Sequence, residues 1–159
     1  EVMKAPLYEG KPCPVCGEAK CKRKTITETF TYKGQRLVVP NYVVYYCPHC
    51  REEFLDHHLI RPHQQKLRDW QRAIDGLLSA EEIRQLRKSL GLSQDEFSEL
   101  LGGGGKAFAR YETGAVRQSV AMDNLLRAVQ KHPGLLLEFA KARGVVLSPV
   151  KQRRLREAA

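Results

Sequence analysis

The sequence predicts an α+β fold of two domains, in which a small antiparallel β-sheet precedes an all-α domain of five short helices. All five cysteines of the 159-residue chain lie within its first 50 residues, among segments that alternate as β-strands do. The last 80 residues contain two S-x-x-E capping boxes and apolar residues at helical spacing. The chain therefore divides into two parts by composition.

The composition indicates an anionic partner. Hydrophobic residues make up 42% of the chain, its formal net charge is +9 and its pI is about 9.5. Such a surplus of lysine and arginine favours nucleic acid. No apolar run is long enough to cross a membrane, and no secretory signal is evident. We therefore expect a soluble cytoplasmic protein with no membrane partner, and the odd cysteine count fits a reducing compartment.

Two cysteine pairs form the most specific motif. Cys13 and Cys16 lie in CPVCG, Cys47 and Cys50 lie in CPHC, and thirty residues separate the pairs. Two residues between thiolates let both sulfurs bind one tetrahedral ion, and Gly17 permits the left-handed turn that follows such a pair. Four thiolates fill the coordination sphere of zinc. We therefore predict one structural Zn²⁺ per chain, with no position open for a substrate.

Two alternatives to a site of four cysteines are a redox dithiol and a zinc site with a different ligand. A redox dithiol of the thioredoxin type would open a helix in a βαβ unit, whereas these pairs flank predicted strands. Cys21, His49 or His57 could each replace one ligand. The paired cysteines already suffice, however, and histidines beside such sites are usually surface residues.

The segment between the cysteine pairs predicts a three-stranded sheet. TITETFTY alternates strictly, with apolar residues on one face and four threonines on the other. Residues 33–35 supply a turn, and RLVVPNYVVYY predicts two further short strands divided at Pro40-Asn41. So small a core could hardly fold alone, and we expect metal and fold to be lost together. Residues 1–55 form this predicted zinc-binding domain.

Residues 56–78 predict a connecting helix that begins near Pro62. Apolar side chains recur on one stripe, at Leu67, Trp70, Ile74 and Leu77. We expect this stripe to pack on a neighbouring domain, and we assign no ligand role to the histidines of the segment.

Residues 79–142 predict five short helices and an independently folding domain. Ser79 with Glu82, and Ser93 with Glu96, fix the first two helix starts, because the serine caps the N3 amide and the glutamate returns to the serine N–H. Glycines end both helices. The other three helices are expected over residues 105–112, from Ser119 and from Pro133.

Two helices joined by a glycine turn over residues 94–112 are typical of a helix-turn-helix, whose second helix lies in the DNA major groove. Arg110 is the best candidate for a bidentate contact to guanine, and Lys106 could contact guanine or phosphate. Gln94 and Arg117 are candidates for phosphate contacts. The alternative for Lys106 and Arg110 is an ordinary solvated helix face.

The four consecutive glycines before Lys106 also invite comparison with a nucleotide-binding loop. The P-loop pattern G-x-x-x-x-G-K-[ST] requires glycine where Leu100 stands and a hydroxyl residue where Ala107 stands, so the match fails twice. We therefore interpret the glycines as a turn between helices.

Residues 143–159 predict a basic tail. From Lys141 onward the net charge is +5. This tail could contact DNA phosphates or could be a frayed, solvated end, and the sequence favours neither.

The segment LRKSLGLSQDEFSELLGGGGKAFARYETGAVRQS resembles the Xre-type helix-turn-helix. Together with CPVCG, YYCPHC and AMDNLLRAVQKHP, it makes residues 12–140 resemble the MqsA family of type II antitoxins, a zinc-finger and helix-turn-helix family. The resemblance implies an N-terminal zinc domain that binds a toxin, commonly an mRNA-cleaving ribonuclease. It also implies a C-terminal domain that dimerises and represses the toxin–antitoxin operon at a palindrome.

The resemblance also assigns roles to single residues. Cys13, Cys16, Cys47 and Cys50 match the zinc ligands of the family, and Arg110 matches its base-contacting arginine. The companion position, often asparagine, is Lys106 here. Asparagine pairs with adenine whereas lysine prefers guanine or phosphate, so the operator sequence stays open.

We therefore expect an antitoxin that represses its own operon as a homodimer on duplex DNA and neutralises a cognate toxin. No nucleophile and base occur as a set, so we expect no enzymatic activity. One alternative is a zinc-ribbon repressor of the Xre type without a toxin partner. Another is an RNA-binding or redox protein that uses the cysteine pairs.

Overall fold

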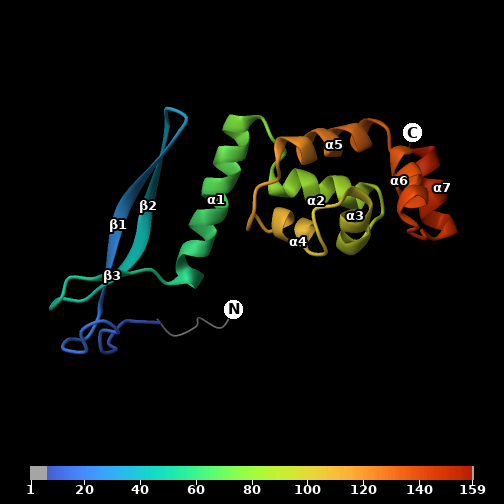
Figure 1. Cartoon of the computed structure of the whole chain (residues 1–159). Helices are drawn as coiled ribbons and strands as arrows, with labels where there is room; N and C mark the ends of the chain where they lie inside the picture. The colour runs from blue at the N-terminus through green and yellow to red at the C-terminus, as the bar shows by residue number, and fades with distance from the viewer. Residues whose placement is uncertain (1–6, 159) are drawn as a thin grey trace. The chain divides into compact units, whose positions relative to one another are not determined.

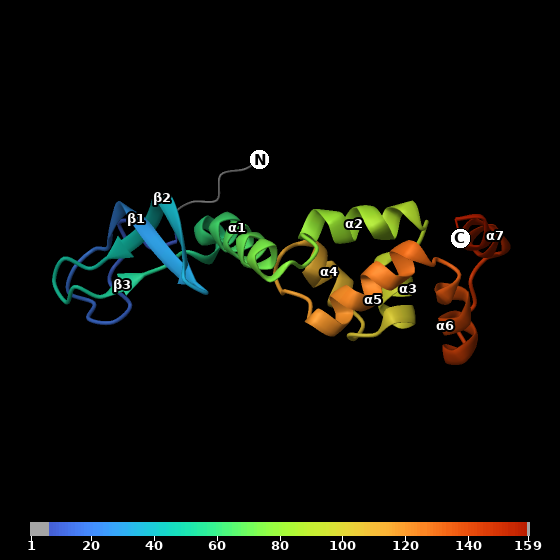
Figure 2. The same cartoon turned by 90° about the horizontal axis from the view of Figure 1, so that it is seen from above.

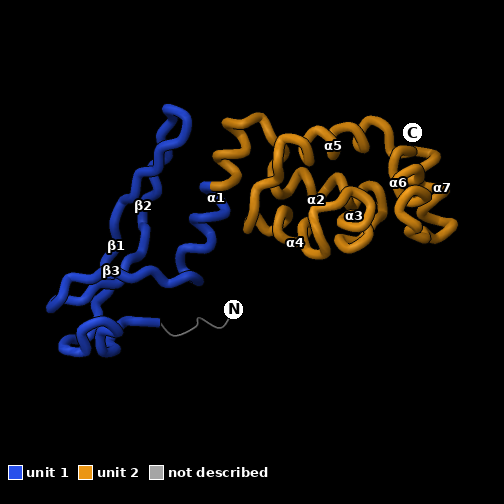
Figure 3. The backbone as a smooth tube through the Cα atoms, viewed as in Figure 1, with its two compact units in different colours: residues 1–67 blue, residues 68–159 orange. Residues whose placement is uncertain are grey.

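The computed structural model describes residues 7–158 and contains a small β-sheet followed by seven helices (Figure 1). Residues 1–6 of the predicted zinc domain and residue 159 of the predicted tail lie outside the described residues. The chain forms two compact units, residues 1–67 and residues 68–159 (Figure 3). The α+β class is confirmed, and each unit is described below by itself.

The N-terminal unit is built on one antiparallel sheet in the order β1-β2-β3. Its strands are β1 (Lys22–Tyr32), β2 (Gln35–Tyr46) and the short β3 (Glu53–Phe54). A two-residue turn joins β1 to β2, with φ of 47° at Lys33 and 78° at Gly34. Positive φ at both positions matches the twist of the paired strands.

The predicted strand break at Pro40-Asn41 is wrong. β2 continues through both residues, and the register with β1 shifts between Ile26 and Glu28. Such a bulge leaves one residue unpaired, so the proline loses no ladder hydrogen bond there, and Asn41 takes a φ of 59°. The third strand is instead β3, which lies after the second cysteine pair and pairs with the end of β2.

The sheet packs on the first half of α1 (His57–Asp75). Ile60 of this helix completes a small core with Val39, Tyr42 and Val44. The sheet alone would leave this apolar face in water, so the helix supplies its cover.

Helix α1 begins five residues before Pro62, where the sequence predicted its start. The Asp56 carboxylate accepts a hydrogen bond of 2.9 Å from the backbone N–H of His58, and so caps the helix start. Pro62 therefore lies inside α1, where it costs one backbone hydrogen bond.

The C-terminal unit contains the second half of α1 and six further helices. Figures 1 and 2 show α2, α3, α4 and α5 gathered side by side in this unit. These helices are α2 (Ala80–Ser89), α3 (Gln94–Leu101), α4 (Ala107–Glu112), α5 (Val120–Lys131), α6 (Leu135–Arg143) and α7 (Pro149–Glu157). The five predicted helices are α2 to α6. Among the described residues, no helix is long and apolar enough to cross a membrane.

Both predicted capping boxes form. Ser79 Oγ and Ser93 Oγ accept hydrogen bonds of 3.2 and 3.1 Å from the backbone N–H groups three residues later. In return, Glu82 and Glu96 accept from the backbone N–H groups of the two serines at 2.7 and 2.8 Å. The starts of α2 and α3 are thus fixed by local sequence.

One apolar core unites the helices of this unit. Each helix from α2 to α7 contributes at least one completely buried side chain to it, and these include Ile83, Phe97, Phe108, Leu126, Leu136 and Leu155. Because Leu155 belongs to this core, the predicted basic tail contains a folded helix, α7, and is not a frayed end.

Candidate metal centre and nucleic-acid interface

The four paired cysteines meet at the base of the sheet, although thirty residues separate the pairs in the sequence. The sulfurs of Cys13 and Cys50 lie 3.7 Å apart, those of Cys16 and Cys47 lie 3.6 Å apart, and all four fall within 4.8 Å of one another. A tetrahedral ion with Zn–S bonds of about 2.3 Å would hold its sulfurs about 3.8 Å apart. The four side chains therefore can hold one metal ion.

The two cysteine turns share one backbone geometry. The N–H of Gly17 donates to the carbonyl of Cys13, and the N–H of Arg51 donates to the carbonyl of Cys47, both at 2.9 Å. Each turn is followed by a left-handed residue, with φ of 70° at Gly17 and 64° at Arg51. The sequence predicted this conformation for the glycine, but the arginine gave no such signal because it rarely adopts positive φ.

The surroundings of Cys13 favour its thiolate. Burial acts to raise the pKa of this thiol, but hydrogen bonds from the backbone N–H groups of Cys16 and Val15 outweigh it and lower the pKa to about 6. Thiolates are the form that binds metal. Four sulfur ligands leave no coordination position for a substrate, which is the arrangement of a structural site.

The three residues considered as substitute ligands lie outside the set of four cysteines. Cys21 is buried against Cys13 and Cys47, and burial raises the pKa of its thiol. His49 and His57 are exposed. Within residues 7–158, the only group of ligand atoms close enough to hold a metal ion is the four cysteines.

Helices α3 and α4 form the predicted helix-turn-helix within the C-terminal unit. The glycine turn between them carries φ of 95° at Gly103 and 91° at Gly104, and Lys106 occupies the N-cap of α4. Lys106 and Arg110 are exposed, and the first turn of α4 separates them. Both side chains are therefore accessible to a partner on this helix.

The other two candidate DNA contacts are held within the chain. Gln94 donates through Nε2 to Oε2 of Glu112 at 2.8 Å, and Arg117 forms an ion pair of 2.9 Å with Asp75. The amide of Gln94 thus bridges the start of α3 to the end of α4. Arg117 has a third of its side-chain surface exposed.

Glu112 also binds Arg87 of α2 through two parallel hydrogen bonds, from Nε at 2.6 Å and from Nη2 at 3.0 Å. This pairing raises the pKa of the Arg87 guanidinium, chiefly through the hydrogen bond to Glu112. The pair fixes α4 against α2. Sequence analysis missed it, since residues 25 positions apart show no common periodicity.

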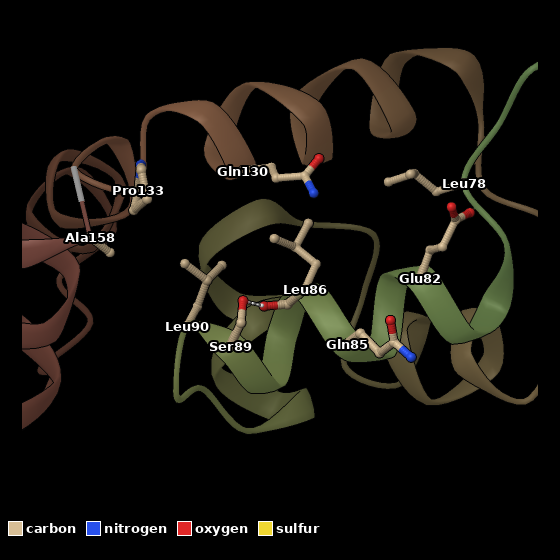
Figure 4. Close-up of a pocket in the computed structure, with 9 residues that line it drawn as sticks. All are labelled: Leu78, Glu82, Gln85, Leu86, Ser89, Leu90, Gln130, Pro133 and Ala158. Carbon is tan, nitrogen blue, oxygen red and sulfur yellow. Dashed lines mark hydrogen bonds between the residues drawn. The ribbon is translucent and has the colours of Figure 1, made fainter.

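A cavity of about 520 Å³ lies between α2 and α5 (Figure 4). Three of its polar side chains are engaged in the fold: Ser89 donates to the carbonyl of Leu86 at 2.7 Å, Glu82 belongs to the capping box of α2, and Gln85 donates to Glu81 at 3.2 Å. The remaining lining comes from Leu78, Leu90, Gln130, Pro133 and Ala158. These side chains do not assemble a nucleophile with a base.

A cluster of four cysteines that can hold a metal ion, on a small sheet and followed by a helix-turn-helix in an all-α unit, defines a two-unit protein of the cysteine-cluster and helix-turn-helix class. Comparison with models of protein families identifies the family within this class. The family model described as the antitoxin component of bacterial toxin–antitoxin systems, MqsA, matches residues 11–140. The chain belongs to the MqsA antitoxin family, as its motifs predicted.

A curated relative supports the same assignment. The antitoxin MqsA of Escherichia coli (strain K12) is 32% identical over 128 residues, which cover 80% of this chain and 98% of the relative. The chain is thus an antitoxin of a toxin–antitoxin system. Helix α7 and the turn before it lie beyond the residues that the family model matches.

Proposed function

We propose that this antitoxin neutralises a cognate toxin, a ribonuclease, through its N-terminal unit and represses its own operon as a cytoplasmic homodimer through its C-terminal unit. It has no catalytic role of its own. The observation that carries the DNA-binding part is the exposure of Lys106 and Arg110 on α4, in a chain of formal charge +9. The neighbouring bonds of Glu112 to Gln94 and Arg87 hold the same helix in place.

The roles of the four candidate contacts follow from their positions. Arg110 contacts guanine, because its planar guanidinium can donate to O6 and N7 together. Lys106, at the N-cap of α4, contacts guanine or phosphate. Gln94 and Arg117 contact the phosphate backbone on either side of α4. Their bonds to Glu112 and Asp75 orient them for this role.

We further propose that the ion held by Cys13, Cys16, Cys47 and Cys50 is Zn²⁺, one per chain. Its role is to close the N-terminal unit, which presents the toxin-binding surface. The donor set of four thiolates is the one typical of structural zinc.

Arg110→Ala tests the recognition helix. Operator binding should weaken by about 1–3 kcal/mol and sequence preference should relax at one base pair of each half-site. Arg84→Ala is the matched control, since Arg84 is an exposed arginine of α2 outside the proposed interface. A footprint and a preference unchanged from those of the control would contradict the assignment.

The alternative function is that of a member of this family that represses transcription without a toxin partner. Expression of the neighbouring reading frame should arrest growth, and co-expression of this chain should restore it. Growth that is unaffected by the neighbour, together with sequence-specific DNA binding by this chain, would favour this alternative.

A further inference from the structure

Arg72, near the end of α1, is completely buried although it carries a charge. Its guanidinium donates from Nη1 to Asp69 Oδ1 at 2.8 Å and from Nε to Gln118 Oε1 at 3.0 Å. A buried guanidinium is costly unless its donors are satisfied, so this one is kept by specific partners. Its third nitrogen, Nη2, donates to the backbone close to Arg110.

That nitrogen, Nη2, donates to two backbone carbonyls, one in the last turn of α4 and one in the loop that follows it. The acceptors are the carbonyl of Tyr111, at 3.2 Å, and that of Val116, at 2.7 Å. The N–H of Val116 in turn donates to the carbonyl of Arg110 at 3.3 Å. Two hydrogen bonds therefore connect the Arg72 side chain to the backbone of the proposed base-contacting residue.

Arg68, one turn earlier on α1, holds the same segment. Its Nη1 donates to the carbonyl of Gly114 at 3.0 Å. Gly114 is buried and takes a φ of 71° in the turn that ends α4. Two arginines of α1 thus bind three carbonyls of the six-residue stretch that follows Arg110.

Gln118 extends this network into the body of the unit. Its Nε2 donates to the carbonyl of Leu78 at 2.8 Å and to Asp123 Oδ1 at 3.0 Å, and Asp123 also accepts from the N–H of Leu78. Arg72 therefore bonds directly to the end of α4 and the loop after it, and through Gln118 it is connected to the start of α5 and to the linker before α2. A change at Arg72 would disturb all three.

We propose that Arg68 and Arg72 are positioning residues of the recognition helix, which set the direction of the Arg110 side chain through the carbonyls of residues 111–116. The role rests on the proposed DNA contacts of α4. A contact to base edges tolerates little displacement, so the shell that fixes α4 determines sequence preference. The DNA-binding unit accordingly begins inside α1, before the first helix of the predicted domain.

The test uses full-length protein and four variants. Arg68→Ala removes the bond to Gly114, and Arg68→Lys restores one donor. Arg72→Lys keeps the charge but loses the planar fork. Arg84→Ala removes one exposed arginine elsewhere and so controls for charge. Amide hydrogen exchange of residues 110–116 is measured without DNA, and affinities are measured for a duplex that wild-type protein selects from a random pool and for a scrambled duplex.

Arg68→Ala should speed exchange in residues 110–116 about fivefold and lower the ratio of the two affinities about fivefold, as expected for one lost charge-assisted hydrogen bond. Arg68→Lys should recover part of both effects, and Arg84→Ala should show neither. A purely structural role would lower the melting temperature of Arg68→Ala while its affinity ratio stayed equal to that of Arg84→Ala, and this would overturn the proposal.

If Arg72→Lys fails to fold, Arg68→Ala still decides the outcome. Wild-type protein that selects no duplex would overturn the proposed DNA binding, and the positioning role with it. Wild-type protein that discriminates, beside Arg68→Ala with an unchanged ratio, would overturn the positioning role alone.

Discussion

Gly103 is the one residue of the glycine turn at which both a positive φ and a close neighbour oppose a side chain. Its φ is 95°, and an added Cβ would lie 3.0 Å from Cβ of Ala107 and 3.5 Å from Oη of Tyr111. Gly104 has a similar φ of 91°, but nothing lies within 4 Å of its added Cβ. The backbone is therefore similarly strained for a side chain at both glycines, but only at Gly103 would an added methyl group meet close neighbours.

We expect Gly103→Ala and Gly104→Ala each to cost about 1 kcal/mol of unfolding free energy through positive φ. Gly103→Ala should cost about 1 kcal/mol more, because the new methyl group displaces the first turn of α4. Only this variant should also weaken DNA binding. Urea titration and duplex binding would measure both effects, and equal losses for the two variants would contradict the packing argument.

Among the elements, α7 is the addition that lies beyond the residues matched by the family model. Leu155 inserts into the common core, and Lys151 Nζ contacts the two carboxylate oxygens of Glu96 at 2.6 and 2.7 Å. The pair joins α7 to the first turn of α3. Much of the basic charge at the end of the chain is thus carried by a packed helix.

The Glu96–Lys151 pair predicts a pH dependence of stability. Burial acts to raise the pKa of the Glu96 carboxyl, but the hydrogen bonds from Lys151 and Ser93 outweigh it and lower the pKa below its ordinary value of 4.5. A lowered folded-state pKa contributes stability that is complete above pH 4.5 and is lost as the pH falls through the folded-state pKa.

Glu96→Gln should therefore lower the free energy of unfolding at pH 7, by about 1 kcal/mol or less because the pair is partly exposed. The difference should vanish in acid. Glutamine also completes a capping box, so the substitution isolates the charge. Chemical denaturation of both proteins between neutral and acidic pH would measure this, with Glu81→Gln as the exposed control. A difference that persists in acid would refute the ion-pair explanation.

Helix α1 belongs in part to each unit, because the boundary falls after Leu67 within it. A fragment that begins at Ser79 would lack Arg72 and Leu78, which are two of the three hydrogen-bond partners of Gln118. Residues 68–159 should therefore unfold at a higher temperature than residues 79–159, by several degrees for a loss of about 1–3 kcal/mol. Thermal scans of the two fragments would compare them. Identical transitions would show that the second half of α1 adds nothing.

At the scale of the whole molecule, the two units depend on different sources of stability. Among residues 7–158, the main core cluster of the N-terminal unit has four buried apolar residues, whereas that of the C-terminal unit has sixteen. A bound zinc ion could contribute an apparent 10–16 kcal/mol, roughly, to the smaller unit. Metal loss should therefore act on one unit only.

A strong chelator should abolish the dispersed NMR signals of residues 12–50 and leave those of residues 80–155 in place. Cys47→Ser should have the same effect without a chelator, because it removes one ligand. Metal analysis should give one zinc per wild-type chain. Simultaneous loss of both sets of signals would contradict the independence of the units.

The cluster of four cysteines and the starts of α2 and α3 were predictable because their signals are local. Each cysteine pair and each capping box occupies four consecutive residues, and the geometry that it requires follows from that spacing. The start of α1 and the path of β2 were not predictable in this way. Proline ordinarily favours the first turn of a helix and interrupts a strand. Pro62 nevertheless lies inside α1, because Asp56 caps the helix start, and Pro40 lies inside β2, because the sheet has a bulge there.

The sequence by itself determined the class of fold, the four cysteines, the helix-turn-helix and the family, since short motifs and periodic patterns carry all four. Only the tertiary structure decided that Arg72 is buried, that Glu112 bonds α4 to α2, and that the basic tail forms a packed helix. Arg72, Glu112 and Lys151 look like any other charged residues in the sequence. Three of their partners, Gln118, Arg87 and Glu96, lie 25 to 55 residues away in the sequence, and only folding brings these side chains close enough to bond.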